Sequence, residues 1–185
     1  MERIRRLAGV YSLNGKAAEG YPTLSQPIEA DYTGTSTTGG GDLADFLRLG
    51  ETLVDKEPHL ALSETATVRQ YRWPDNSLVA EGGPGRIDTQ REPLRVVSDN
   101  AANRLRVLWL RDSFGTALAP FMALTFEETL QLDYDRTPPE RFAELVEGFA
   151  PDLVIITVVE RNLGNDFFSA LPSSEPAEAP TAEAR

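Results

Sequence analysis

Cysteine is absent from this 185-residue chain, and histidine occurs once, at position 59. Without cysteine there can be no disulfide framework, no thiolate metal site and no cysteine nucleophile. Basic residues are also in the minority, because 18 Lys and Arg face 29 Asp and Glu, for a formal charge of -11. This balance argues against a protein whose main task is to bind nucleic acid or anionic lipid.

Long apolar runs are missing as well. No window approaches the roughly 20 apolar residues of a membrane-spanning helix, so we expect no membrane span. The basic start Met1–Arg6 is not followed by an apolar run long enough for the core of a signal peptide. A cytoplasmic protein is therefore expected if Met1 is the true start. The hydrophobic content of 41% suits one domain with a buried core.

The two ends of the chain differ in composition from its middle. Residues 9–41 are rich in glycine, serine, threonine and proline, which predicts a loop, so residues 1–40 are assigned to a flexible N-terminal arm. Residues 171–185 are rich in proline, alanine, glutamate and serine and are expected to form a disordered tail. The folded domain is therefore expected to span residues 41–170.

A short helix is expected directly after the arm. Asp42 is placed to cap its amino end, and Leu43, Phe46 and Leu47 repeat at helical spacing. Gly50 supplies the left-handed residue that ends the helix. One face of this helix should therefore be buried.

Short strand-like segments follow between residues 65 and 97. The candidates are 67–71, 77–80 and 94–97, with proline, aspartate, asparagine and glycine at the turns between them. This region is expected to be a small β excursion attached to the main sheet.

Strands and helices alternate in the second half of the chain. The expected strands are 104–110, 126–132 and 153–159, and the expected helices are 116–124 and a segment that begins with a Thr137/Glu140 capping box around Pro138. The nearly continuous β-branched run 153–159 is typical of a central strand covered on both faces. The alternation predicts an α/β fold, a three-layer, flavodoxin-like parallel sheet.

The segment Arg111–Gly115 is the first candidate for chemistry. It places Ser113 just past the carboxyl end of a strand and at the amino end of a helix, where ligands collect in open α/β sheets. The backbone amides of Ser113 and Gly115 are the expected donors to a developing oxyanion, and Gly115 lets a substrate approach the backbone closely. The alternative is that Ser113 only caps the helix.

Two further side chains belong to the candidate site. Asp112 is placed to orient a catalytic base, or else to form a turn-stabilising hydrogen bond with the backbone. Arg161 follows the last strand and can hold a substrate carboxylate or the oxyanion, the alternative being an ion pair with Glu160. No pattern predicts a cofactor or metal site, and a phosphate site is disfavoured because no glycine-rich loop has the required spacing.

Four stretches of this chain carry a family resemblance. Gly41–Ala44 and the blocks 107–121, 151–156 and 159–163 resemble the SGNH hydrolase-like domain of the alginate O-acetylation proteins AlgX and AlgJ, over about residues 40–163. The resemblance implies that Ser113 is a nucleophile that carries an acetyl group to a hydroxyl of an exported polysaccharide. It also implies an acetyl donor, other proteins of an acetylation complex as partners, and a place in the periplasm or cell envelope.

The catalytic base of that family is missing here. The family takes its base and the orienting carboxylate from an Asp-x-His-Trp segment N-terminal to the Gly-Asp-Leu block, and this chain contains no such segment. A serine hydroxyl needs an adjacent base to become a nucleophile. The lone histidine, His59, lies on the other side of the block, and no histidine follows Ser113, where classical SGNH esterases place theirs.

Two interpretations follow from the missing base. Either the chain is an N-terminally shortened member of the family, or it is a relative that kept the fold and lost the chemistry. The sequence therefore predicts a polysaccharide O-acetyltransferase-like protein that is weakly active or inactive as given. The alternative is a non-catalytic module that binds polysaccharide or a partner protein.

Overall fold

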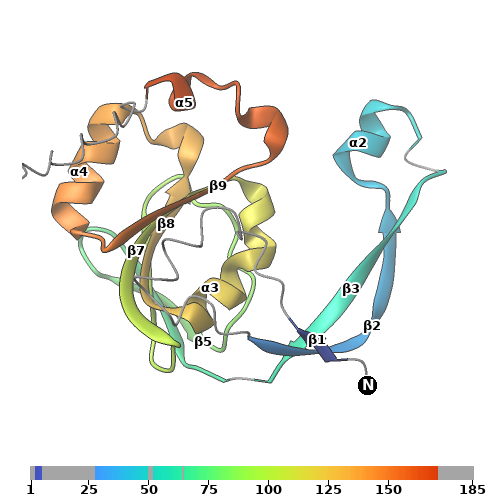
Figure 1. Ribbon diagram of the computed structural model, residues 1–185, viewed down its shortest axis with the longest axis horizontal. Coiled ribbons are helices and arrows are strands. Elements are labelled where there is room, and N and C mark those ends of the chain that lie inside the picture. Colours follow the sequence, from blue (N-terminus) through green and yellow to red (C-terminus); the bar gives the residue numbers. More distant parts are fainter. Residues whose placement is uncertain (1–2, 6–27, 50–51, 64, 171–185) are drawn as a thin grey trace, which may run out of the picture.

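The computed structural model describes residues 3–5, 28–49, 52–63 and 65–170. These residues form two sheets, a three-stranded ribbon and the six-stranded sheet of the body (Figure 1). The ribbon consists of β1 (Arg3–Arg5), β2 (Glu29–Gly39) and β3 (Val54–Leu62), with helix α2 (Gly41–Phe46) between the last two. The body sheet consists of β4 (Val68–Arg72), β5 (Leu78–Gly82), β6 (Leu94–Ser98), β7 (Asn103–Arg111), β8 (Phe126–Asp133) and β9 (Leu153–Thr157). Its helical segments are η2 (Ser113–Leu118), α3 (Ala119–Thr125), η3 (Tyr134–Arg136), α4 (Pro139–Phe149), η4 (Glu160–Asn162) and α5 (Asp166–Ala170).

The body sheet is mixed, with the order β5-β4-β6-β8-β7-β9. β7 pairs in parallel with β8 and with β9, so that Leu108 lies opposite both Leu130 and Val154. The other pairs are antiparallel. The α/β class is confirmed, but the expected parallel sheet is limited to three strands. The predicted β excursion supplies the remaining strands of the same sheet. Its connections contain no crossover helix, and strands joined in this way pair antiparallel.

Alternate residues of β7 face opposite sides of the sheet. Val107 and Trp109 pack in one core cluster, which α3 covers with Ala119 and Ala123. Leu108 and Leu110 pack in a second cluster, which α4 covers with Leu145 and Phe149. Helices therefore lie on both faces of the sheet, and Figure 1 shows α3 and α4 on opposite sides of β7 and β8.

β9 is an edge strand, so the prediction that 153–159 is the central strand is wrong. Val154 is 37% exposed, whereas the side chains of Val107 to Leu110 on β7 are fully buried. A run of β-branched residues indicates that the side chains of the segment are suited to a packed sheet. It does not report how many neighbouring strands the segment has, and here the described residues provide only β7.

β2 overturns the prediction that the glycine- and threonine-rich stretch before Gly41 has no regular structure. Its register with β3 runs from Ala30 opposite Leu62 to Gly39 opposite Val54. Threonine is favoured in strands once a partner supplies the main-chain hydrogen bonds, and β3 is that partner. The rest of the predicted arm, residues 6–27, and the predicted tail, 171–185, lie outside the described residues.

Helix α2 exists and buries Ala44, but two of the three apolar residues predicted to form its buried face are exposed. Phe46 is 83% exposed and Leu47 is 52% exposed, because α2 lies at the tip of the ribbon, away from the body (Figure 1). Arg48, with a φ of 57°, takes the left-handed conformation expected of Gly50. Gly50 and the side chains of Asp42 and Leu43 lie outside the described residues.

The predicted capping box at the start of α4 also does not form. The helix begins at Pro139, with Pro138 in the capping position and no side-chain cap. Thr137 is buried, and its hydroxyl donates to the Asp133 carbonyl at 3.0 Å. None of the helices in the described part of the chain is both long and apolar enough to cross a membrane.

Candidate functional site

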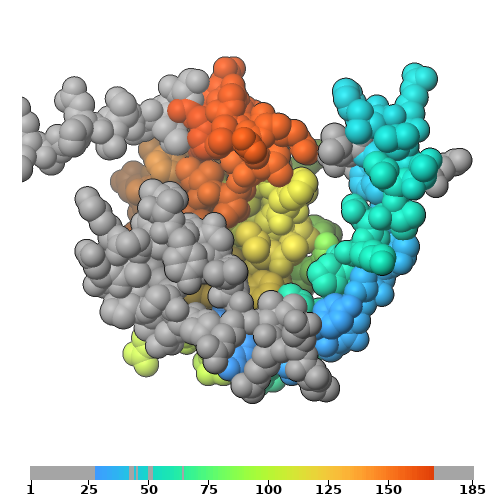
Figure 2. All heavy atoms as spheres, turned by 45° about the vertical axis from the view of Figure 1, so that its right-hand side comes forward, coloured from blue at the N-terminus to red at the C-terminus, as the bar shows by residue number. Residues whose placement is uncertain are grey.

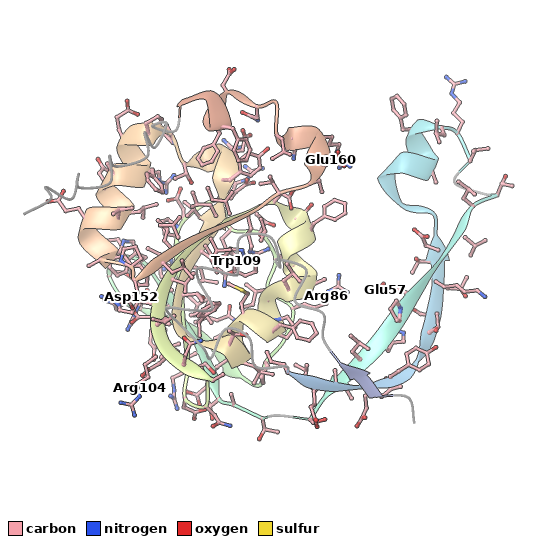
Figure 3. All side chains as sticks on the ribbon, in the orientation of Figure 1. Glu57, Arg86, Arg104, Trp109, Asp152 and Glu160 are labelled. Carbon is pink, nitrogen blue, oxygen red and sulfur yellow. The ribbon has the colours of Figure 1, made fainter. Side chains whose placement is uncertain are left out.

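Ser113 lies at the carboxyl edge of the three parallel strands. It is the first residue of η2 and follows β7 after a single linking residue, Asp112. Figure 3 marks the two ends of the sheet: Arg104 and Asp152 lie at its amino end and Glu160 beyond its carboxyl end. The Ser113 side chain is exposed. Neither its hydroxyl nor its amide has a hydrogen-bond partner among the described residues. The predicted placement is confirmed, while the nucleophilic role stays a prediction.

Asp112, rather than Ser113, caps the turn. Its Oδ1 accepts a hydrogen bond from the Phe114 amide at 2.9 Å, and its Oδ2 accepts one from the Val159 amide at 2.7 Å. A buried carboxylate that binds backbone amides is held in one orientation. The structure therefore shows the second of the two roles weighed for Asp112, a hydrogen bond that stabilises the turn. The Ser113 hydroxyl is left out of the cap.

The Gly115 amide is not the free donor that the sequence suggested. It donates to the Asp112 carbonyl at 3.1 Å, because the tight 3-10 turn closes on that oxygen. Gly115 is buried, and a Cβ built on it would lie 2.6 Å from Arg111 Cδ and 3.1 Å from Trp109 Cζ2. The residue is glycine because two large side chains pack against its backbone. The Ser113 amide is the remaining expected oxyanion donor.

Arg161 lies beside the serine turn, as the sequence predicted. Its guanidinium carbon is 5.6 Å from the centroid of the Phe114 ring, and Phe114 directly follows Ser113. Phe114 is 56% exposed, and Arg161 is exposed as well. A guanidinium over an aromatic face is a favourable arrangement, and it holds Arg161 next to the residue that follows Ser113. The carboxyl edge thus presents a hydroxyl, an aromatic face and a cation side by side.

His59 lies on the ribbon, whereas Ser113 lies in the turn that follows β7 of the body sheet. It occupies an exposed position on β3, opposite Gly34, and its carbonyl accepts a hydrogen bond from the Thr33 hydroxyl at 3.2 Å. In the space-filling view the ribbon stands apart from the body along its upper length (Figure 2). Across that space Glu57 pairs with Arg86 at 2.7 Å (Figure 3). No interaction among the described residues connects His59 with the serine turn.

Arg111 is a functional candidate that the sequence reasoning missed. Its side chain is fully buried directly under the turn, and its guanidinium carbon lies 4.8 Å from the centroid of the Trp109 ring. Burial lowers the pKa of Arg111 to about 10, while the carboxylates of Asp88, Asp112 and Asp133 act in the opposite direction. An arginine directly after the apolar run 107–110 was the available signal, since a charge there is costly to bury unless it is bound.

The described residues contain no group of three or more His, Asp or Glu side chains arranged to hold a metal ion. The described groups at the carboxyl edge are the Ser113 hydroxyl and amide, the Phe114 ring and the Arg161 guanidinium.

The fold is similar to solved bacterial structures. PatB1 from Bacillus cereus superposes with a TM-score of 0.53 at 13% identity, over 87% of this chain and 59% of that chain. PatB1 with a sulfonyl adduct gives 0.51 at 16% identity, over 86% and 59%. A DHHW family protein from Eubacterium siraeum gives 0.50 at 16% identity, over 89% and 57%. No protein-family model and no curated protein sequence matches the chain.

These similarities show a shared fold. The chain spans somewhat more than half of the length of each of these structures.

Proposed function

We propose that this chain belongs to a polysaccharide O-acetyltransferase-like protein with an SGNH-like, three-layer fold, in which Ser113 accepts the acetyl group. The single observation that carries the proposal is the exposed Ser113 hydroxyl. It lies at the carboxyl edge of the parallel strands and takes no part in holding the turn. Because Asp112 does the capping, the serine has no structural task that would explain it.

The proposed reaction has two balanced steps. The Ser113 Oγ attacks the acetyl carbonyl carbon of a donor ester, the new Oγ–C bond forms, and the bond to the donor oxygen breaks. The proton of the hydroxyl passes to a base and then to the leaving oxygen. The oxygen of a sugar hydroxyl next attacks the acetyl carbon of the acetyl-serine, the bond between that carbon and Oγ breaks, and the proton of the sugar hydroxyl passes through the base to Oγ. The Ser113 amide is positioned to bind the oxyanion in both steps.

The proposal requires a general base beside Ser113. A serine hydroxyl near neutral pH is a poor nucleophile until a base removes its proton. The chain's single histidine lies on the ribbon. Added imidazole is therefore expected to raise the reactivity of Ser113, since a small base in solution can occupy the open place beside an exposed hydroxyl.

Sulfonyl labelling tests the proposal directly, and the PatB1 structure with a sulfonyl adduct suggests the reagent. Phenylmethylsulfonyl fluoride is added to the full chain with and without imidazole, and intact mass and peptide mapping locate the label. Label at Ser113 that increases with imidazole supports the proposal. Ser113→Ala must abolish it, while Ser63→Ala, at an exposed serine of the ribbon end, must leave it unchanged. Absence of label at Ser113 at every imidazole concentration tested contradicts it.

A second candidate is a non-catalytic module that binds polysaccharide at the same edge. It is favoured by the position of His59, which leaves the described site without an imidazole. Under this alternative, oligosaccharide binding persists in Ser113→Ala, and hydrolysis of an acetyl ester stays at the buffer rate with or without imidazole. Alginate as the polysaccharide and the cell envelope as the location belong to the same proposal and rest on the sequence resemblance alone.

A further inference from the structure

We propose that Arg111 is the positioning residue of the serine site: its buried guanidinium ties the segment 87–89 to the turn that carries Ser113 and places a fixed positive charge against that turn. The connection between segment 87–89 and the turn does not depend on the proposed function. The effect on reactivity rests on the proposed function.

The guanidinium binds the segment 87–89 on one side. Nη2 donates to the carbonyl oxygens of Ile87 and Asp88 at 2.6 and 2.9 Å, and Nη1 donates to the Thr89 hydroxyl at 3.3 Å. This segment has no place in a strand or helix. Its hydrogen bonds to Arg111 therefore replace those that a regular element would provide.

The same guanidinium binds the serine turn and β8 on its other sides. Nη1 donates to the Thr116 hydroxyl at 3.4 Å and to the Asp112 carbonyl at 3.5 Å. Both distances are at the outer limit of a hydrogen bond. Nε donates to Gln131 Oε1 at 2.9 Å. One side chain thus connects three parts of the chain that are distant in sequence. Movement of any of them disturbs the others.

The packing around Arg111 requires this arrangement. Trp109 lies against the guanidinium on one side, and the backbone of Gly115 lies against the aliphatic part of the side chain on another. A Cβ on Gly115 would approach Arg111 Cδ to 2.6 Å. The glycine in the serine turn is therefore there to admit the arginine, which links the two residues functionally.

The charge is held without a direct carboxylate partner among these hydrogen bonds. The acceptors are carbonyls, hydroxyls and one amide oxygen, all of them neutral. A buried cation in a medium of low dielectric constant favours negative charge nearby, and Ser113 is two positions away along the chain. Arg111 therefore holds its charge against the turn that carries Ser113, through the Asp112 carbonyl and the Thr116 hydroxyl, and stabilisation of an oxyanion or alkoxide at the serine is part of the same proposal.

Lysine at position 111 is expected to keep the positive charge of arginine but not its hydrogen-bonded connection between the segments. Its ammonium keeps the charge, but it lacks the planar fork that reaches both the 87–89 carbonyls and Gln131. Arg111→Lys should therefore retain the electrostatic effect and lose the mechanical connection, whereas Arg111→Met should lose both.

The first test is amide hydrogen exchange on the full chain, which needs no activity. Arg111→Met and Arg111→Lys are each expected to speed exchange about tenfold or more in 87–90 and in 112–116 together, because both variants remove the guanidinium fork that connects these segments. The matched control is Arg106→Met, which removes an arginine of the same strand that stacks on Phe149 at 4.5 Å and pairs with Glu128. If Arg111→Met does not fold, hydrogen exchange of Arg111→Lys tests the inference in its place. A folded Arg111 variant with unchanged exchange in both segments overturns the inference.

The second test is the rate of sulfonyl labelling at Ser113, measured in imidazole and at equal folded fraction. We expect a loss of about tenfold or more in Arg111→Met, partial recovery in Arg111→Lys, and no loss in Arg106→Met. If the labelling rates at Ser113 rise and fall with the melting temperatures of the variants, the proposed effect of the Arg111 charge on Ser113 is contradicted. Absence of label in the unaltered protein contradicts the proposed function, and hydrogen exchange then still decides whether Arg111 connects the two segments.

Discussion

Asp112 and Val159, 47 residues apart in sequence, are joined by a hydrogen bond of 2.7 Å from the Val159 amide to the Asp112 carboxylate. The other oxygen of the same carboxylate accepts from the Phe114 amide at 2.9 Å. One side chain therefore fixes the exit of β7 relative to the exit of β9. Since Arg161 follows β9 and contacts Phe114, this connection sets the cation's position beside Ser113.

Removal of the Asp112 carboxylate should be costly. Asp112→Ala leaves two backbone amides without their charged acceptor, and we expect a loss of about 2–4 kcal/mol in the free energy of unfolding. Asp112→Asn keeps one acceptor oxygen and should lose less. Urea denaturation followed by circular dichroism measures both. A loss below about 0.5 kcal/mol in Asp112→Ala would show that the two amides find other partners.

Thr157 is expected to matter through the Trp109 indole. Trp109 is fully buried, and its Nε1–H donates to the Thr157 hydroxyl at 2.8 Å. Thr157→Val preserves the shape but leaves that donor unpaired, which should lower the free energy of unfolding by about 1–3 kcal/mol. Thr157→Ser, which keeps the hydroxyl, is the control. Equal stability of the valine and serine variants in chemical denaturation would contradict the role of this hydrogen bond.

Asp99 predicts a pH dependence of stability. Its carboxylate accepts a hydrogen bond from the Thr67 amide at 2.7 Å, and this bond lowers the pKa of Asp99 below its ordinary value. A carboxylate with a lowered folded-state pKa stabilises the protein above its unfolded pKa of about 3.9, and this contribution disappears as pH falls through the folded value.

Asp99→Asn should therefore be less stable than the unaltered protein near neutral pH. The difference in unfolding free energy should shrink as the pH falls from about 5 to about 2. Urea denaturation at several pH values checks this. A difference that is constant over the whole range would mean that protonation of Asp99 is not linked to folding.

Truncation of Phe149 should destabilise the protein strongly, whereas truncation of Phe46 should have almost no effect. Phe46 is 83% exposed at the ribbon tip, whereas Phe149 is fully buried between α4 and the sheet. Phe149→Ala should cost about 3–5 kcal/mol, and Phe46→Ala should stay within about 0.5 kcal/mol. Thermal and urea unfolding distinguish the two. A large loss in Phe46→Ala would restore the buried helical face that the sequence predicted.

The body of the fold was largely predictable from local patterns. The strands near 68, 78, 94, 104, 126 and 153 were expected from alternation, β-branched residues and intervening turn residues, and each is present. The failures share one cause. Residues 29–39 become a strand because β3 pairs with them, and Thr137 turns away from its predicted cap because Asp133 offers an acceptor. In both cases a partner outside the local window overrides composition.

The site divides in the same way. Local chain order alone places Ser113 past the end of a hydrophobic strand and at the start of a helical turn, because both features depend on neighbouring residues. Local order also supplied Asp112, Gly115 and Arg161 as candidates. Their actual tasks depend on contacts made across the fold, and no spacing rule encodes which of several possible hydrogen bonds forms.

The sequence by itself determined the α/β class, the place of the serine at a strand-to-helix turn and the absence of cysteine chemistry, since these depend on residue type and local order. Only the tertiary structure decided that Asp112 caps the turn, that Gly115 makes room for Arg111, and that His59 lies on a separate ribbon. The physical reason is that buried polar groups must find hydrogen-bond partners, and those partners come from whichever distant segments packing brings together.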